Sequence, residues 1–117
     1  MAESILLEKS YKFALRIVRL YSYLCNEKHE YVLSKSVLQD GTFVGAHIKE
    51  AQQAEGKPAF VQDMNAALKR ATRTEYWLEL LRDGEYLDDK EFDSIHSDCN
   101  ELIKMLTSTI KTSKTRM

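Results

Sequence analysis

The sequence has 117 residues, the usual size of one domain, and its 17 basic and 18 acidic residues give a formal net charge of −1. With 44% hydrophobic and 30% charged residues, four glycines and one proline, the composition excludes collagen-like, disordered and disulfide-scaffold proteins. The charge balance is also far from that of strongly basic nucleic-acid-binding domains, so nucleic-acid contact would need a local patch. We expect one domain over residues 1–117.

The chain carries no signal for a membrane. No apolar run approaches the ~20 residues needed to cross a bilayer, and the first residues form neither a signal peptide nor a lipidation motif. Cys25 and Cys99 lack CxxC spacing, so zinc-thiolate and thioredoxin-type chemistry lack their ligands. We expect a cytoplasmic protein without a membrane partner, with both thiols reduced and buried.

Apolar side chains recur at steps of three and four residues, which predicts amphipathic helices. The first helix is expected over 3–26 and the second over 30–54, where Gly41 and Gly45 lie in the helix interior. Each glycine destabilises a helix by up to ~1 kcal/mol relative to Ala, so a compensating gain is required. Either a neighbouring helix packs closely on the glycines, or the helix kinks there.

Two further helices follow. Gly56 as a C-cap and Pro58 in a first turn predict a third helix over 58–82, which Gly84 ends. The expected core stripes are Leu6, Ser10, Phe13, Ile17, Leu20 and Leu24; Leu33, Val37, Val44, Ile48 and Ala51; Phe60, Met64, Ala67, Ala71, Thr74, Leu78 and Leu81; and Phe92, Ile95, Cys99, Leu102, Leu106 and Ile110.

The fourth helix has a clear start. Asp88 and Glu91 resemble a capping box, and Leu87 is placed to pack on Phe92, which predicts a helix over 88–111. Residues 112–117 carry no apolar stripe and are expected to fray.

Four helices of similar length with short connections predict an all-α fold, an antiparallel up-down-up-down four-helix bundle. In that arrangement Cys25 and Cys99 would lie ~13 Å apart along the axis, beyond the ~7 Å reach of a disulfide. We expect no intrachain disulfide.

Several strings together carry a family resemblance: KFALRIVRLY (12–21), EYVLSK (30–35), GT, GAHI and EA (41–42, 45–48 and 50–51) and TEYWLELL (74–81). They resemble the bacterial four-helix-bundle proteins encoded by intervening sequences of 23S rRNA genes, and the resemblance covers residues 5–113. It implies a ring-like homopentamer with no enzymatic activity. The accessory variability determinant proteins of diversity-generating retroelements are similar in architecture. This similarity implies that the partner of the present protein is RNA or a nucleic-acid-handling protein such as a reverse transcriptase.

The second helix departs from the family pattern. The family usually has LLRS before GTS and continues with GANIAE, whereas VLQD precedes GTF here, and His47 and Lys49 replace Asn and Ala. The loss of an Arg and the gain of Asp40 weaken a phosphate-binding interpretation of this helix.

Basic residues recur on one side of the first helix, at steps of three, four and three and about 100° from its core stripe. This basic row consists of Lys9, Lys12, Arg16 and Arg19. Such a row can follow a nucleic-acid backbone, with salt-sensitive binding. The alternative is a solvated or subunit-contact face with intramolecular or intersubunit ion pairs, because Asp98 and Glu101 should lie level with Arg16 and Arg19. The same alternatives apply to a second nucleic-acid candidate, the basic cluster Lys69, Arg70 and Arg73.

The sequence offers little for metal or catalytic chemistry. A di-metal bundle needs paired Glu-x-x-His motifs, which only Asp93-x-x-His96 approaches. No Ser-His-Asp set, phosphate loop or Cys-His pair is present. We therefore expect no catalytic residue, no metal and no cofactor. Glu50 and Glu75 fall near core faces, where a carboxylate needs a partner such as a Tyr or His47.

Aromatic residues beside the core stripes are typical of subunit interfaces. We predict that Tyr76 and Trp77 contact another subunit, with a buried role inside the chain as the alternative for Trp77.

The sequence thus favours a homo-oligomeric interaction protein whose surface binds RNA or a nucleic-acid-handling partner. The alternative is a structural or protein-binding module with no nucleic-acid affinity.

Overall fold

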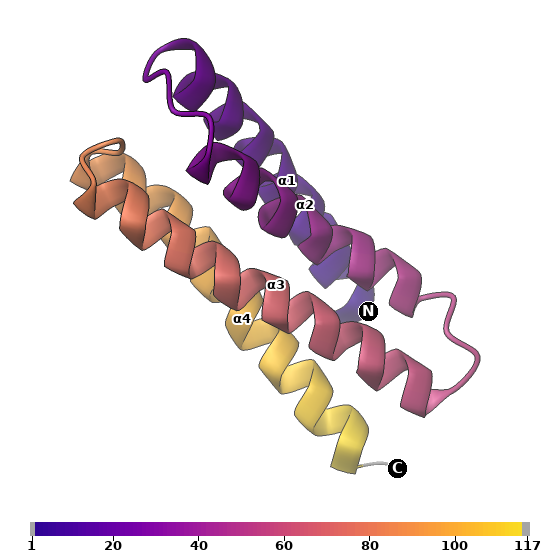
Figure 1. Cartoon of the computed structure of the whole chain (residues 1–117). Coiled ribbons are helices and arrows are strands. Elements are labelled where there is room, and N and C mark those ends of the chain that lie inside the picture. The colour runs from indigo at the N-terminus through magenta and orange to yellow at the C-terminus, as the bar shows by residue number, and fades with distance from the viewer. Residues whose placement is uncertain (1, 116–117) are drawn as a thin grey trace.

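The computed structural model describes residues 2–115, and the side chains of residues 4–115, as four α-helices without a strand in that range. The helices are α1 (Ala2–Asn26), α2 (Leu33–Ala51), α3 (Lys57–Asp83) and α4 (Asp89–Thr115). The chain reverses direction at each of the three connections, so that consecutive helices run alongside one another (Figure 1). The predicted all-α four-helix bundle is confirmed.

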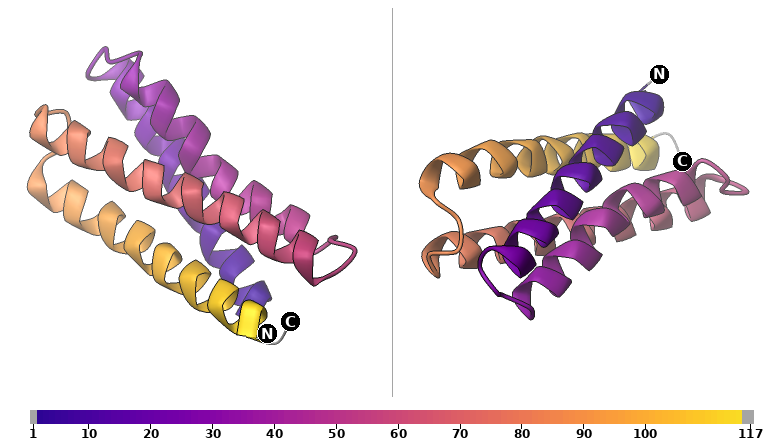
Figure 2. Two further views of the ribbon diagram at one scale, coloured as in Figure 1. Left: turned by 60° about the horizontal axis from the view of Figure 1, so that its bottom comes forward. Right: turned by 90° about the horizontal axis from the view of Figure 1, so that it is seen from above.

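The helices pack around a common centre. α1 packs on α2, α2 on α3, α3 on α4 and α4 on α1, whereas the backbones of the diagonal helices stay farther apart among the described residues. The α1–α4 seam is the sparsest of the four, and Figure 2 shows α1 inclined to α4. The bundle is therefore less tightly closed along this seam than along the other three.

The predicted core stripes account for nearly all of the observed core. Every predicted position on α1 and α4 is buried, but Leu33 and Phe60, each in the first turn of its helix, are only partly buried. Val61 is buried beside Phe60. The sequence period thus defines the core well, except where a helix begins at the end of the bundle.

The start of α2 lies three residues later than predicted. The Glu30 carboxylate accepts hydrogen bonds from the backbone N–H groups of Val32, Leu33 and Ser34, at 3.2, 2.9 and 2.7 Å. Glu30 is buried, and its carboxylate occupies the place where a further turn of helix would form. Glu30 therefore caps α2 from outside instead of belonging to it.

The connection between α2 and α3 corrects a second expectation. Gly56 is the N-cap of α3 and not the C-cap of α2, which ends at Ala51 and is capped by Gln52. Pro58 lies in the first turn of α3, as predicted. Gly84 caps the end of α3, also as predicted.

The structure confirms the predicted start of α4 but not its predicted end. The predicted cap is confirmed, because the backbone N–H of Glu91 donates to Asp88 Oδ1 at 2.7 Å. α4 extends beyond its predicted end at residue 111 and continues through Thr115, whose hydroxyl donates to the Lys111 carbonyl. No Gly or Pro interrupts this segment, so the helix propagates beyond its apolar stripe. Residues 116 and 117 lie outside the described residues.

No helix in the described part of the chain combines the length and the apolar character that a membrane span requires. Both cysteines are free, Cys25 half-buried and Cys99 fully buried. Burial, together with the nearby charges of Glu75 and Asp98, raises the pKa of the Cys99 thiol to about 12. Cys99 is therefore protonated at neutral pH and suits a structural position.

Candidate functional site

Three members of the basic row, Lys9, Arg16 and Arg19, face the α1–α4 seam, whereas Lys12 lines a groove between α1 and α2. Acidic residues pair with three of the four members. Arg16 contacts Asp98 Oδ2 at 2.7 Å and also donates to the carbonyl and hydroxyl of Ser94. Lys9 contacts Glu101 at 3.3 Å across the same seam. Lys12 pairs with Glu8 on its own helix at 3.0 Å. These pairs are the alternative that the sequence had left open for the row.

Arg19 differs from the other three members of the basic row. It has no ion-pair partner among the described residues. It lines a cleft of about 400 Å³ between the second half of α1 and the start of α4. The cleft is lined by Arg16, Arg19, Leu20, Tyr23, Leu87, Asp88, Glu91 and Ile95. Basic side chains from α1 thus face acidic side chains from α4 across an apolar floor.

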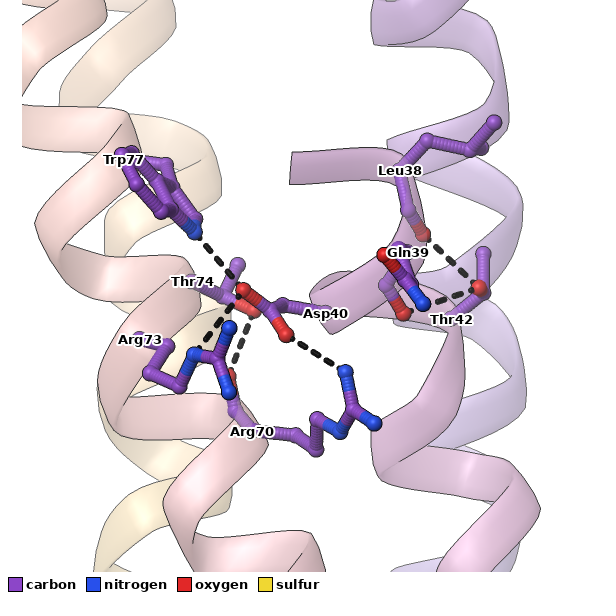
Figure 3. A network of polar contacts seen from close by, with 8 residues as sticks. All are labelled: Leu38, Gln39, Asp40, Thr42, Arg70, Arg73, Thr74 and Trp77. Carbon is purple, nitrogen blue, oxygen red and sulfur yellow. Dashed lines mark hydrogen bonds and ion pairs between the residues drawn. The ribbon is translucent and has the colours of Figure 1, made fainter. Parts of the chain in front are cut away.

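The second basic cluster surrounds one buried carboxylate. Asp40 is 2% exposed and contacts Arg70 Nη1 at 2.8 Å and Arg73 Nε at 3.3 Å. Trp77 Nε1 donates to the same carboxylate at 2.7 Å, so three donors from α3 converge on one residue of α2 (Figure 3). Two of the three predicted phosphate-binding cations are therefore engaged inside the chain. Lys69, the third, is exposed and has no ion-pair partner among the described residues.

The predicted interface aromatics lie beside this network. Trp77 is partly buried against the core, so it has the intrachain role that the sequence allowed as an alternative. Tyr76 is 56% exposed and contacts the Trp77 ring edge-on, with centroids 5.2 Å apart. Phe43, also exposed, lies under the Arg70 guanidinium at 4.6 Å. An aromatic and cationic surface therefore remains open outside the buried network.

The two glycines of α2 lie at the close approach of α1. A Cβ atom on Gly41 would meet the Ile17 side chain at 2.7 to 3.0 Å, and one on Gly45 would meet Ser10 Oγ at 3.2 Å. α2 is one uninterrupted helix through both positions. The structure thus shows the close packing that the sequence offered as one explanation.

An apolar groove of about 580 Å³ lies on the outside of α1 and α2. We call it the α1–α2 groove; it is lined by Ser4, Leu7, Glu8, Tyr11, Lys12, Ala14, Thr42, Gly45, Ala46 and Lys49. Tyr11 is 65% exposed, and Leu15 and Val18 continue the exposed apolar surface along α1. The sequence gave a signal for this surface, because these three residues follow at steps of four and three on the side of α1 away from the core stripe.

The two carboxylates expected near core faces have different surroundings. The expectation is wrong for Glu50, whose side chain is 64% exposed and bonds His47 Nδ1 at 3.1 Å. Glu75 is partly buried, and its partner is His96 of α4, with 2.9 Å between Oε2 and Nε2. Glu50 therefore lies outside the buried stripe of α2, although His47 is its partner as expected.

Sequence reasoning missed the role of Asp40, which it treated only as a repulsive charge. A signal was present, because Arg70, Arg73 and Trp77 follow at steps of three and four and so form a row of donors on α3. What the sequence could not supply was the register that places Asp40 of α2 opposite this row.

Comparisons with known proteins agree on one family. The family model described as 23S rRNA-intervening sequence protein matches residues 2–108. A crystal structure from Bacteroides thetaiotaomicron, described as a protein with unknown function from the S23 ribosomal protein family, is 47% identical. The match covers 95% of this chain and 99% of that one, with a TM-score of 0.93. No functionally curated protein matches. The chain therefore belongs to the 23S rRNA-intervening sequence protein family.

Proposed function

We propose that this protein is a non-enzymatic interaction module that assembles with copies of itself into a ring, with five subunits as the family resemblance implies. The observation that carries the proposal is the open apolar surface of α1 and the α1–α2 groove, where Tyr11, Leu15 and Val18 are each at least 40% exposed. Contiguous apolar surface of this kind is typical of protein interaction sites. Covering it with a second chain removes this surface from water.

A second exposed surface supports assembly by unlike faces. Tyr76, Phe43 and the Arg70 and Arg73 guanidinium groups lie over α2 and α3, around the buried Asp40. Aromatic residues and Arg are the residue types enriched at interface centres. A ring requires a contact between two different faces of each subunit. The α1–α2 groove and this aromatic surface give the chain two such faces.

The mass in solution tests assembly. Light scattering on the wild-type chain is expected to give about five times the monomer mass. Tyr11→Asp places a charge in the α1–α2 groove and is expected to reduce the mass toward one chain. Val32→Asp is the control, because Val32 is 74% exposed in the α1–α2 connection, outside both surfaces. A wild-type monomer, or equal masses for the two variants, would refute the proposal.

RNA association is a second candidate function, favoured by the family description and by two cations. Arg19 and Lys69 have no ion-pair partner among the described residues, and Arg19 lines the cleft between α1 and α4. A salt-dependent affinity for RNA would come from such unpaired cations. The paired cations Lys9, Arg16 and Arg70 would first have to break intrachain contacts.

The RNA test therefore targets the unpaired cations. Fluorescence anisotropy with labelled rRNA at about 50 mM and about 300 mM salt is expected to show binding at the lower concentration only. The double variant Arg19→Ala, Lys69→Ala is expected to bind RNA more weakly than the wild type. The double variant Lys35→Ala, Lys104→Ala removes two positive charges elsewhere on the surface and serves as the control. Absence of wild-type binding at low salt would leave a protein-binding module without nucleic-acid affinity.

A further inference from the structure

Three metal-ligating side chains converge between α3 and α4. Glu75 and Glu79 lie one turn apart on α3, and His96 faces them from α4. One ligand atom of each residue lies within 4.8 Å of the other two. The sequence did not reveal this group, because its residues come from two helices whose register is known only from the fold.

The imidazole of His96 is held in place before any ligand binds. Its ring stacks on Phe92, with centroids 4.8 Å apart and 22° between the planes, and Phe92 is buried. His96 Nε2 and Glu75 Oε2 form a hydrogen bond at 2.9 Å, so a bound ion would take the place of the proton between them. The side chains of His96 and Glu75 are 27% and 30% exposed. His96 and Glu75 are therefore oriented by their surroundings, while the exposed Glu79 leaves the group open to an ion from solvent.

The charge of the group favours a cation. With a neutral imidazole, Glu75 and Glu79 contribute two negative charges one turn apart on the same helix, an arrangement that is mutually repulsive. Within the described part of the chain, no Lys or Arg forms an ion pair with either carboxylate. The neighbouring guanidinium of Arg82 pairs with Asp83 and lies over the Phe92 ring, and its charge reaches Glu79 without forming an ion pair. A divalent ion would offset both charges at once.

We propose that Glu75, Glu79 and His96 form a three-ligand site for Zn²⁺ or a divalent ion of similar preference. One imidazole nitrogen and two carboxylate oxygens are ligands that Zn²⁺ accepts, whereas Mg²⁺ and Ca²⁺ prefer oxygen alone. Three protein ligands leave a fourth tetrahedral position for water or for a donor from another molecule. The bound ion would cross-link the last third of α3 to the first third of α4.

Calorimetric titration of the untagged, chelator-treated full-length protein with ZnCl₂ tests the site. We expect one ion per chain, and at least tenfold weaker binding for Glu79→Gln and for His96→Gln. Glu79→Gln leaves the contact between Glu75 and His96 intact, so its effect does not depend on disrupting that pair. His47→Gln is the matched control, because His47 and Glu50 form a similar contact on α2 without a third ligand. Cys25→Ser controls for thiol binding.

A second readout separates a metal site from a simple ion pair. Excess Zn²⁺ is expected to raise the melting temperature of the wild type and of His47→Gln, and to leave that of Glu79→Gln unchanged. Equal amounts of Mg²⁺ are expected to have no effect. The proposal is overturned if the wild type takes up no Zn²⁺, or if Glu79→Gln and His96→Gln bind it as the wild type does.

Discussion

Asp40 shows how one residue changes the interpretation of a surface. A carboxylate that is 2% exposed needs strong partners, and Arg70, Arg73 and Trp77 supply three donors. The two Arg residues are thus already paired with a carboxylate inside the chain and would share that pairing with any phosphate. Their outward surfaces stay available for aromatic or protein contacts, because Arg73 is 60% exposed and Arg70 lies over Phe43.

We predict that Asp40→Ala lowers the free energy of unfolding by about 2 kcal/mol, since it removes the acceptor of charged hydrogen bonds and leaves the Trp77 N–H without its partner. Arg73→Ala should cost less than ~1 kcal/mol, because the Arg73 side chain is mostly exposed. Urea unfolding of both variants measures the two values. Equal losses would mean that the exposed Arg73, and not the buried carboxylate, dominates the network.

At the scale of an element, the start of α2 depends on Glu30. Burial alone would raise the pKa of its carboxyl group, but the backbone N–H groups of Leu33, Ser34 and Val32 outweigh burial and lower the pKa below its ordinary value of 4.5. These are the N–H groups that the first turn of a helix leaves without partners, and a negative charge there also suits the helix dipole.

Replacing Glu30 by Gln tests this cap through pH. Because the folded pKa is lowered, the stabilisation by Glu30 is fully present above the unfolded pKa and is lost as pH falls through the folded value. Glu30→Gln is therefore expected to be less stable than the wild type by about 1 kcal/mol at pH 7, with the difference shrinking below about pH 4.5. Urea unfolding at pH 7 and pH 3 measures it. A difference that grew on acidification would contradict the cap.

The contact of α1 and α2 at Gly41 gives a second prediction for an element. Ala is a better helix former than Gly by about 1 kcal/mol, but its Cβ would lie 2.7 Å from Ile17 Cγ1 in the core. We expect Gly41→Ala to destabilise the fold by about 1 to 3 kcal/mol, as overpacking outweighs helix propensity. Thermal and urea unfolding provide the measurement.

A double-variant cycle identifies the cause. In an Ile17→Ala background the space beside Gly41 is empty, so Gly41→Ala should become neutral or stabilising. Gly45→Ala, which would place a Cβ 3.2 Å from a single hydroxyl, should cost less than Gly41→Ala. An unchanged penalty in the Ile17→Ala background would rule out steric overlap.

The elements also show what sequence can predict and where it stops. Local signals were sufficient for the core period of α1 and α4 and for the Asp88 cap, because each depends on residues within a turn or two. The Glu30 cap was missed because Glu is an uncommon cap and acts from outside the helix. The contacts of Asp40 and of His96 depend on the register between helices, which one sequence does not encode locally.

At the scale of the molecule, the four seams of the bundle are unequal. The α1–α2 seam has the close contact at Gly41, and the α2–α3 seam has the buried Asp40 network. The α1–α4 seam is the sparsest, holds the cleft of about 400 Å³ and is bridged by partly exposed ion pairs from Lys9 and Arg16. Local opening should therefore begin where packing is thinnest, at this seam.

Arg16 and Arg19 provide a matched pair for testing that idea. Both line the cleft, but only Arg16 bridges to α4, through Asp98 and Ser94. Arg16→Ala should remove about 1 kcal/mol of stabilisation between α1 and α4. We therefore expect amide exchange about fivefold faster than in the wild type for residues 16–26 and 89–98. Arg19→Ala should leave these rates near the wild-type values. Hydrogen exchange followed by mass spectrometry measures both, with 37–48 of α2 as the internal reference. Uniform acceleration over all four helices would show instead that the bundle opens only as a whole.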